Sequence, residues 1–199
     1  MGSLEIVPLL TFVMITTYTP GPNNISSASM GLLFGYLKSL PFLVGIASGF
    51  VIIMLACGGL SGFMTSLVPS LSTWLRWAGC AYILWLAFRT LKASYSFHGE
   101  ERTVPLGFTN GMMLQLLNPK VIIYGLTLYS TFLYSLVTRP AWMLFSALCL
   151  AFNAWLSISL WALFGSTLKK YVTHPGIRKS INFILFLLLV YTAISLLNK

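Results

Sequence analysis

Two short polar segments interrupt apolar stretches of the chain, and their residue types suit the binding of a small zwitterion. The first is Thr19-Pro20-Gly21-Pro22-Asn23-Asn24, and the second is Asn118-Pro119-Lys120. Proline lacks a backbone N–H and pushes the residue before it out of the α region, so each segment is expected to break a helix. Within a bilayer, broken backbone is tolerated only where protein or a water-filled cavity covers it, and many transporters bind their substrates at paired breaks.

The first break offers backbone groups of both signs to a ligand. A half-helix expected to begin between Asn24 and Ser26 exposes its first N–H groups, and the positive end of its dipole suits a carboxylate. A half-helix expected to end near Tyr18 points carbonyl oxygens at the same gap, which suits an ammonium. Asn23 and Asn24 could cap the second half-helix, orient the ligand, or do both. A zwitterionic amino acid therefore fits this break.

Lys120 is the one ionisable side chain that the sequence places far from a membrane surface. A buried charge is costly there unless it is paired or hydrated, and the chain has no Asp and only the acids Glu5, Glu100 and Glu101. Lys120 must be held by carbonyls of the opposite break, bind the substrate carboxylate, lose its proton, or snorkel to the surface. We expect it near the substrate, with the carboxylate on Lys120 and the Asn24 half-helix and the ammonium on free carbonyls and Asn118.

Tyr124 could line the same cavity, although a core or lipid contact explains an aromatic residue there equally well. The residues predicted to bind substrate are Pro20, Gly21, Pro22, Asn23, Asn24, Asn118, Pro119, Lys120 and Tyr124. The structural alternative is a pair of proline-kinked helices that bind no ligand.

The composition predicts an integral membrane protein. Of the 199 residues, 57% are hydrophobic and 8% are charged, and the mean hydropathy is +0.86, so the chain cannot form a solvated surface. Because about 20 residues cross a hydrocarbon core, we predict six transmembrane helices, the first and fourth of them broken. The apolar stretches are 6–37, 39–75, 77–88, 106–138 with its break, 140–168 and 180–198.

The positions of the breaks divide the single membrane domain into two halves. Residues 1–97 form a first three-helix repeat, 98–104 a connecting loop, and 105–199 a second repeat. Three spans per half is an odd number, so the second repeat must enter the membrane with opposite polarity. The predicted fold is therefore all-α, with two inverted three-helix repeats as in many secondary transporters.

The basic residues predict the orientation. One face of the membrane collects eight of them, and the other face collects three, so the positive-inside rule places both termini outside the cytoplasm. Basic loops against an anionic leaflet account for the net charge of +9, and no nucleic-acid partner is expected. The first set is Lys38, Arg89, Lys92, Arg102, Lys169, Lys170, Arg178 and Lys179, and the second is Arg76, Arg139 and Lys199.

Other residues restrict the class of function. The chain contains no G-x-x-x-x-G-K-[ST] loop, so transport is expected to be secondary or passive. No span offers an Asp, Glu or His for catalysis, and we expect no enzyme, metal site or cofactor. Cys57, Cys80 and Cys149 stand singly and are expected to be inert. Glycine pairs at G-x-x-x-G spacing, 31/35, 45/49 and 58/62, predict close helix packing.

Three segments together resemble the LysE/RhtB family of amino-acid exporters. They are residues 19–24, residues 117–120 with Ile123-Tyr124-Gly125 after them, and the tryptophan-rich stretch 77–87. The ending 187–191 and the third span are most similar to the cysteine and O-acetylserine exporters. The resemblance covers nearly the whole chain. It implies six spans, an inner-membrane location, and efflux of small neutral amino acids by proton antiport.

One residue departs from the pattern of this family. Many of its members carry an aspartate where this chain has Asn23, and an asparagine cannot titrate. Proton coupling would have to use Lys120, Glu5 or a path of water molecules, and acid-independent efflux stays open. We predict a secondary exporter that works by alternating access, with a passive pore as the alternative. An amino-acid substrate, the lipid bilayer and protons are the expected partners, and a homo-oligomer is compatible with the sequence.

Overall fold

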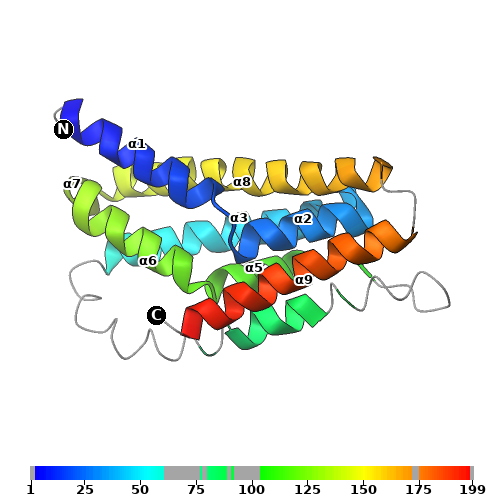
Figure 1. The fold of residues 1–199 in the computed structure, drawn as a ribbon. Coiled ribbons are helices and arrows are strands. Elements are labelled where there is room, and N and C mark those ends of the chain that lie inside the picture. Colours follow the sequence, from blue (N-terminus) through cyan, green and yellow to red (C-terminus); the bar gives the residue numbers. More distant parts are fainter. Residues whose placement is uncertain are drawn as a thin grey trace.

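The structure, a computed structural model, describes residues 3–60, 77, 80–88, 91, 104–171 and 175–197, and within these residues it is helical and contains no strand (Figure 1). The predicted all-α class is confirmed for this part of the chain. The elements are α1 (Ser3–Tyr18), α2 (Pro22–Phe34), α3 (Tyr36–Gly59), α5 (Phe108–Leu116), α6 (Pro119–Thr127), the π-helical turn η2 (Leu128–Phe132), α7 (Tyr134–Val137), α8 (Pro140–Tyr171) and α9 (Pro175–Leu197). Residues 80–88 are helical as well.

Both predicted breaks are present. The backbone is extended at Gly21 between α1 and α2, and at Asn118 between α5 and α6. A proline then opens each following helix, at the position where its missing N–H leaves no hydrogen bond unmade. In Figure 1, α1 and α2 lie nearly end to end, as do α5 and α6, and both gaps lie near the middle of the bundle. At about 1.5 Å per residue, neither α2 with 13 residues nor α5 with 9 could cross a bilayer alone.

The first broken helix differs from the prediction at both ends of its second half. α2 begins at Pro22, earlier than expected, because proline fits the first helical position. It ends at Phe34 rather than at Leu37, because Gly35 adopts a φ of +86°. Glycine reaches that left-handed region without steric cost, and α3 starts immediately afterwards.

The second broken helix is less regular than predicted. The apolar stretch after Asn118 was expected to continue as one helix, but α6 passes at Leu128 into η2, where the Leu133 N–H donates to the Leu128 carbonyl at 2.8 Å. α7 follows as a single turn. No proline or glycine marks this π-helical turn in the sequence, so the pattern that predicted the breaks could not predict it.

Glycines bring two pairs of helices into backbone contact. A Cβ added at Gly31 of α2 would collide with the Ala162 carbonyl of α8, and one at Gly165 would collide with the α2 carbonyl of Ala28. Gly45 of α3 and Gly111 of α5 make the same reciprocal contact in the second pair. The close packing expected at residues 31 and 45 is confirmed. Because both α2 and α5 carry one side of a break, these contacts fix where the breaks lie.

Polar side chains lie inside the bundle and apolar side chains cover its outside. Buried polar residues are Asn24, Ser26, Ser27, Ser29, Ser39, Gln115, Asn118, Ser157 and Ser159. Exposed large apolar residues follow α8 at helical spacing, namely Trp142, Phe145, Leu148, Phe152, Leu156, Leu160 and Leu163. Water-soluble proteins rarely expose a continuous apolar surface of this kind, whereas hydrocarbon solvates it. The distribution therefore agrees with a membrane protein.

Two of the described helices, Tyr36–Gly59 and Pro140–Leu168, are long and apolar enough to cross a membrane, and Ile6–Tyr18 and Phe183–Ile194 are shorter apolar helices. Most of the predicted connecting loop, residues 98–103, lies outside the described residues, as do Gly62, Arg76, Arg89, Lys92, Arg102 and Lys199. The orientation predicted from these basic residues stays a prediction.

Replacing Gly31 with alanine should destabilise the protein. The added methyl group meets a main-chain carbonyl that cannot rotate away, and overpacking of this kind costs about 1–3 kcal/mol, or several degrees in the unfolding temperature. Thermal unfolding of the purified protein in detergent, followed by tryptophan fluorescence, measures the effect. Gly59→Ala is the matched control, because a Cβ there would meet nothing within 4 Å. Equal unfolding temperatures for the two variants would contradict the close contact of α2 with α8.

Candidate functional site

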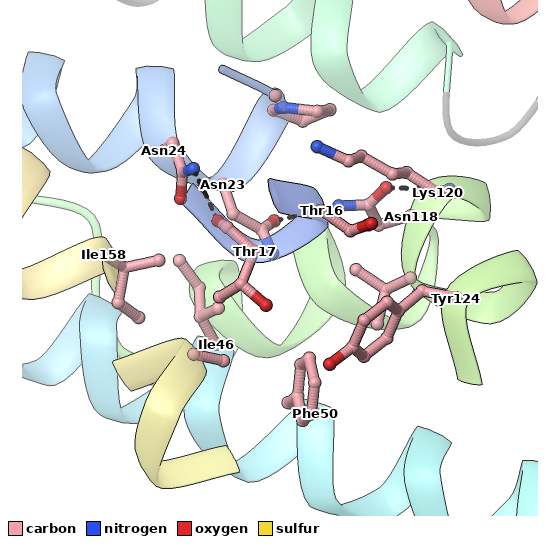
Figure 2. A pocket seen from close by; sticks show the side chains of 14 residues that line it. Thr16, Thr17, Asn23, Asn24, Ile46, Phe50, Asn118, Lys120, Tyr124 and Ile158 are labelled. Carbon is pink, nitrogen blue, oxygen red and sulfur yellow. Dashed lines mark hydrogen bonds between the residues drawn. The ribbon is translucent and has the colours of Figure 1, made fainter. Parts of the chain in front are cut away.

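The two breaks meet at a small cavity inside the bundle (Figure 2). Its volume is about 50 Å³, which is room for about four water molecules. α1, α2, α3, α6 and α8 all contribute to the lining, which consists of Thr16, Thr17, Gly21, Pro22, Asn23, Asn24, Ile46, Phe50, Asn118, Lys120, Val121, Tyr124, Ala154 and Ile158.

The structure brings most of the predicted site residues to this cavity. Gly21, Pro22, Asn23, Asn24, Asn118, Lys120 and Tyr124 belong to its lining. Pro20 and Pro119 do not. Pro20 is exposed in the link between α1 and α2, and Pro119 is buried as the first residue of α6. Both prolines therefore contribute by interrupting helices rather than by contacting the cavity.

A chain of side-chain amides joins the two breaks. Asn118 caps α6 by accepting the Lys120 backbone N–H on Oδ1 at 3.1 Å, and its Nδ2 donates to Asn23 Oδ1 across the gap, also at 3.1 Å. The Asn23 Nδ2 in turn donates to Gln115 Oε1 on α5. Asn118 and Gln115 are almost completely buried, with 2% and 0% of their surface exposed. The amide chain therefore fixes the start of α2 against both sides of the second break.

The backbone of α6 sets the direction of all three amides. An N–H can only donate, so Asn118 must turn its oxygen toward Lys120 and its nitrogen toward Asn23. Asn23 is then left with its own nitrogen to donate onward to Gln115. The chain ends on Gln115 Nε2, a buried donor without a hydrogen-bond partner in the described part of the protein.

Asn24 ties the two halves of the first broken helix together. Its Nδ2 donates to the carbonyls of Thr17 and Thr19, at 3.0 and 2.9 Å, and the Thr17 carbonyl also accepts from Ser157 of α8. These are the carbonyls that were expected to be bare at the end of α1. Neither Asn23 nor Asn24 caps α2, whose cap residue Gly21 has no side chain to do so. The role left to Asn24 is to hold the end of α1 and to line the cavity.

Lys120 reaches across to the first break. Its Nζ lies 3.1 Å from Thr19 Oγ1 and 3.4 Å from the Thr19 carbonyl. A Cβ at Gly21 would lie 3.3 Å from the same Nζ, so the ammonium group lies against the start of α2. Of the possibilities that the sequence left open for Lys120, the structure shows contact with the opposite break.

The start of α2 presents its first N–H groups near this ammonium. Pro22 is the first residue of the helix and has no N–H, and the Ile25 N–H already bonds the Gly21 carbonyl at 2.9 Å. The N–H groups of Asn23 and Asn24 lie in the first turn, where no earlier helical carbonyl can accept them. Together with Lys120 they form a place of positive potential at the edge of the cavity.

Sequence reasoning missed several residues of the site. Gln115 could have been noticed as an amide in an apolar stretch directly before the second break, because polar residues inside membrane helices are commonly functional. Ile46, Phe50, Ala154 and Ile158 carry no such signal, since nothing in one sequence tells which faces of α3 and α8 turn toward the breaks. Thr17 adjoins the first break and was overlooked.

The other candidate groups do not join this cavity. Cys57 and Cys80 are buried free thiols, and Cys149 is exposed. In the part of the chain that the structure describes, no three His, Cys, Asp or Glu side chains are grouped to hold a metal ion. The site can therefore bind a ligand through backbone and amide dipoles and through the ammonium group of Lys120.

Replacing Asn118 with serine should separate its two roles. Serine caps a helix well but is too short to reach Asn23, so it leaves a buried amide oxygen without its donor, at a cost of about 1–3 kcal/mol. Asn118→Ala loses the cap as well, which adds about 1 kcal/mol. We expect unfolding temperatures in the order wild type, Asn118→Ser, Asn118→Ala. If Asn118→Ser unfolded at the same temperature as the wild type, the hydrogen bond between Asn118 and Asn23 would not contribute to the stability of the protein.

The sequence matches proteins of one family over nearly its whole length. The family model described as "LysE type translocator" matches residues 14–199. A cysteine/O-acetylserine efflux protein of Klebsiella pneumoniae is 37% identical over 95% of both chains. Proteins of the same name from Salmonella choleraesuis and Escherichia coli O1:K1 are 36% and 35% identical over 92% of this chain and 93% of theirs. No solved structure shows a significant match.

The resemblance seen in residues 19–24, 77–87 and 117–125 is thereby confirmed, including its similarity to the cysteine and O-acetylserine exporters. The family match spans both breaks and all the residues that line the cavity. This chain belongs to the LysE family of translocators.

Proposed function

We propose that this protein is a secondary transporter that exports small neutral amino acids, such as cysteine or O-acetylserine, across the cytoplasmic membrane. Membership of the LysE family, and relatives at 35–37% identity that are named as cysteine/O-acetylserine efflux proteins, support the substrate class and an inner-membrane, multi-pass location. The observation that carries the proposal is the cavity between the breaks, where α2 begins and Lys120 crosses the gap.

The substrate carboxylate binds between Lys120 and the start of α2. The lysine ammonium supplies a full charge, and the N–H groups of Asn23 and Asn24 supply directed donors at the positive end of the helix dipole. A carboxylate entering here would replace Thr19 as the main partner of Nζ, which now rests on Thr19 at 3.1 Å.

The substrate ammonium binds to oxygen dipoles rather than to an acid. The residues that line the cavity include no Asp or Glu, and the nearest acceptors are the amide oxygens of Asn23 and Asn118 and the carbonyls at the end of α1. The amide oxygens of Asn23 and Asn118 each accept one hydrogen bond and keep a second lone pair, whereas the Thr17 carbonyl already accepts two, from Asn24 and Ser157. A zwitterion adds no net charge to a site that carries one positive charge, which favours neutral amino acids over basic ones.

The arrangement of the breaks supports two inverted repeats and alternating access. α2 and α5 each lie on the side of the break that faces the basic end, which we define as the end where α2 meets α3 and where Lys38 lies. On this side glycine contacts join α2 to α8 and α5 to α3, and α2 is buried from Asn24 to Leu33. We propose that the described conformation is closed toward the basic, cytoplasmic end. Export then requires these contacts to separate.

Proton antiport is part of the proposal, with Lys120 as the coupling group. Asn23, Asn118 and Gln115 cannot titrate near neutral pH, so the amide chain cannot carry the proton. Among the residues that line the cavity, Lys120 is the one Lys, Arg, His, Asp or Glu. Antiport requires the proton to move opposite to the substrate. Lys120 would take up a proton on the outer side after the carboxylate has left, carry it inward through the empty return step, and give it up to the cytoplasm before the loaded site opens outward. This step adds no new residue to the substrate site.

Counterflow in proteoliposomes tests the transport proposal. Labelled cysteine, O-acetylserine or threonine outside should accumulate transiently against the same unlabelled amino acid inside, and uptake should saturate and depend on pH. Lys120→Met should lower exchange at least about tenfold, because it removes the charge-assisted bond to the carboxylate. Lys38→Met, at the exposed start of α3, is the matched control and should retain exchange.

Full exchange by Lys120→Met would contradict the proposed site while leaving transport intact. Flux that never saturates and shows no counterflow would instead indicate a passive pore. Failure of every amino acid tested would contradict the function itself.

A further inference from the structure

The cavity has a second side, away from the two breaks, which we call the side-chain compartment. Ile46 and Phe50 of α3 and Ile158 of α8 form its walls, and Figure 2 shows the hydroxyl groups of Tyr124 and Thr17 pointing into the space beside them. A substrate whose carboxylate and ammonium lie at the breaks must place its own side chain here. The lining of the compartment therefore decides which amino acids fit.

The ring of Tyr124 is held firmly by other aromatic side chains. It stacks on Phe12 of α1 with ring centroids 5.6 Å apart and planes 13° from parallel, and it lies 6.0 Å from Phe50 at a tilt of 54°. Only 4% of its surface is exposed. Contacts with two other rings restrict the movement of the Tyr124 ring, so the position of its hydroxyl is fixed before any ligand arrives.

The Tyr124 hydroxyl is buried without a hydrogen-bond partner in the described part of the chain. Thr17 lies close enough to interact with it, but among the described residues no atom meets the geometry of a hydrogen bond to it. Buried hydroxyl groups almost always have a partner, and an unmade bond is costly. By contrast, the hydroxyl of Tyr129, which lies in η2 directly after α6, pairs with Ser146 at 2.9 Å. Among the described residues the buried hydroxyls of Ser26 and Ser27 also lack a partner, but of these three only Tyr124 lines the cavity, which can supply one.

We propose that Tyr124 determines specificity by binding a polar atom on the β-carbon of the substrate. The inference rests on the proposed function and deepens it. The phenol can donate to an ester oxygen and can donate to or accept from a thiol or hydroxyl. Cysteine, serine and O-acetylserine all carry such an atom, whereas alanine and valine would leave the tyrosine hydroxyl buried and unpaired.

The geometry of α6 supports this assignment. Lys120 and Tyr124 are four residues apart on one helix, so they lie on the same face and about 6 Å apart along its axis. The carboxylate of a small amino acid can thus lie at Lys120 while its side chain reaches Tyr124. The walls of the compartment offer no charge to a basic or acidic side chain. The choice between substrate side chains therefore depends on the Tyr124 hydroxyl, which is the polar group that this apolar compartment offers them.

Competition of unlabelled amino acids with labelled serine in counterflow tests the proposal. Wild type should prefer serine and cysteine over alanine, and Tyr124→Phe should reduce that preference about fivefold to tenfold while leaving the affinity for alanine unchanged. Tyr129→Phe is the matched control, because it also removes one buried tyrosine hydroxyl but does not line the cavity. It should keep the wild-type preference.

The thermal stability of Tyr124→Phe provides a second readout that does not depend on transport. Because the variant removes an unpaired buried hydroxyl, it should unfold no earlier than the wild type, and serine should stabilise it less than it stabilises the wild type. An unchanged preference, or an equal loss for serine and alanine, would overturn the assignment. If wild type exchanges none of the amino acids, the proposed function fails, which is a different result.

Discussion

The hydrogen bond between Asn118 and Asn23 is the contact on which the arrangement of this protein depends. It joins the two places where the backbone of a helix is interrupted, between α1 and α2 and between α5 and α6. Peptide groups at such breaks need partners wherever water does not reach them. The cap of α6 orients Asn118, and Asn118 orients Asn23 and then Gln115. Because these bonds are used internally, the groups left for a ligand are few and well defined.

The electrostatic character of the site follows from what surrounds that bond. One lysine and the start of α2 provide positive potential, while amide and carbonyl oxygens provide the negative side. Neutral dipoles can solvate a substrate ammonium without the desolvation cost of a second ionised side chain. The closely packed pairs α2 with α8 and α3 with α5 support this arrangement, since any loosening there would separate the breaks.

A feature of the fold or the site could be predicted from the sequence where a residue at that position causes it directly. Proline and glycine act on their own backbone, so the breaks and the contacts at Gly31 and Gly45 could be read from the sequence. Asn24 was recognised as a site residue, but its bonds to Thr17 and Thr19 required the end of α1 to be placed. The π-helical turn, Gln115 as the end of the amide chain, and the walls from α3 and α8 arise from tertiary packing. The spacing of residues within the sequence does not predict these three features.

The central claim is that the site recognises both charged groups of an amino acid at once. Substrate-induced stabilisation of the purified protein, measured in reducing buffer with cysteine, cysteamine and 3-mercaptopropionate, tests it most directly. The account predicts that cysteine raises the unfolding temperature, whereas the analogue without a carboxylate and the analogue without an ammonium produce little or no shift. An equal shift with either analogue would contradict the proposed site between the two breaks.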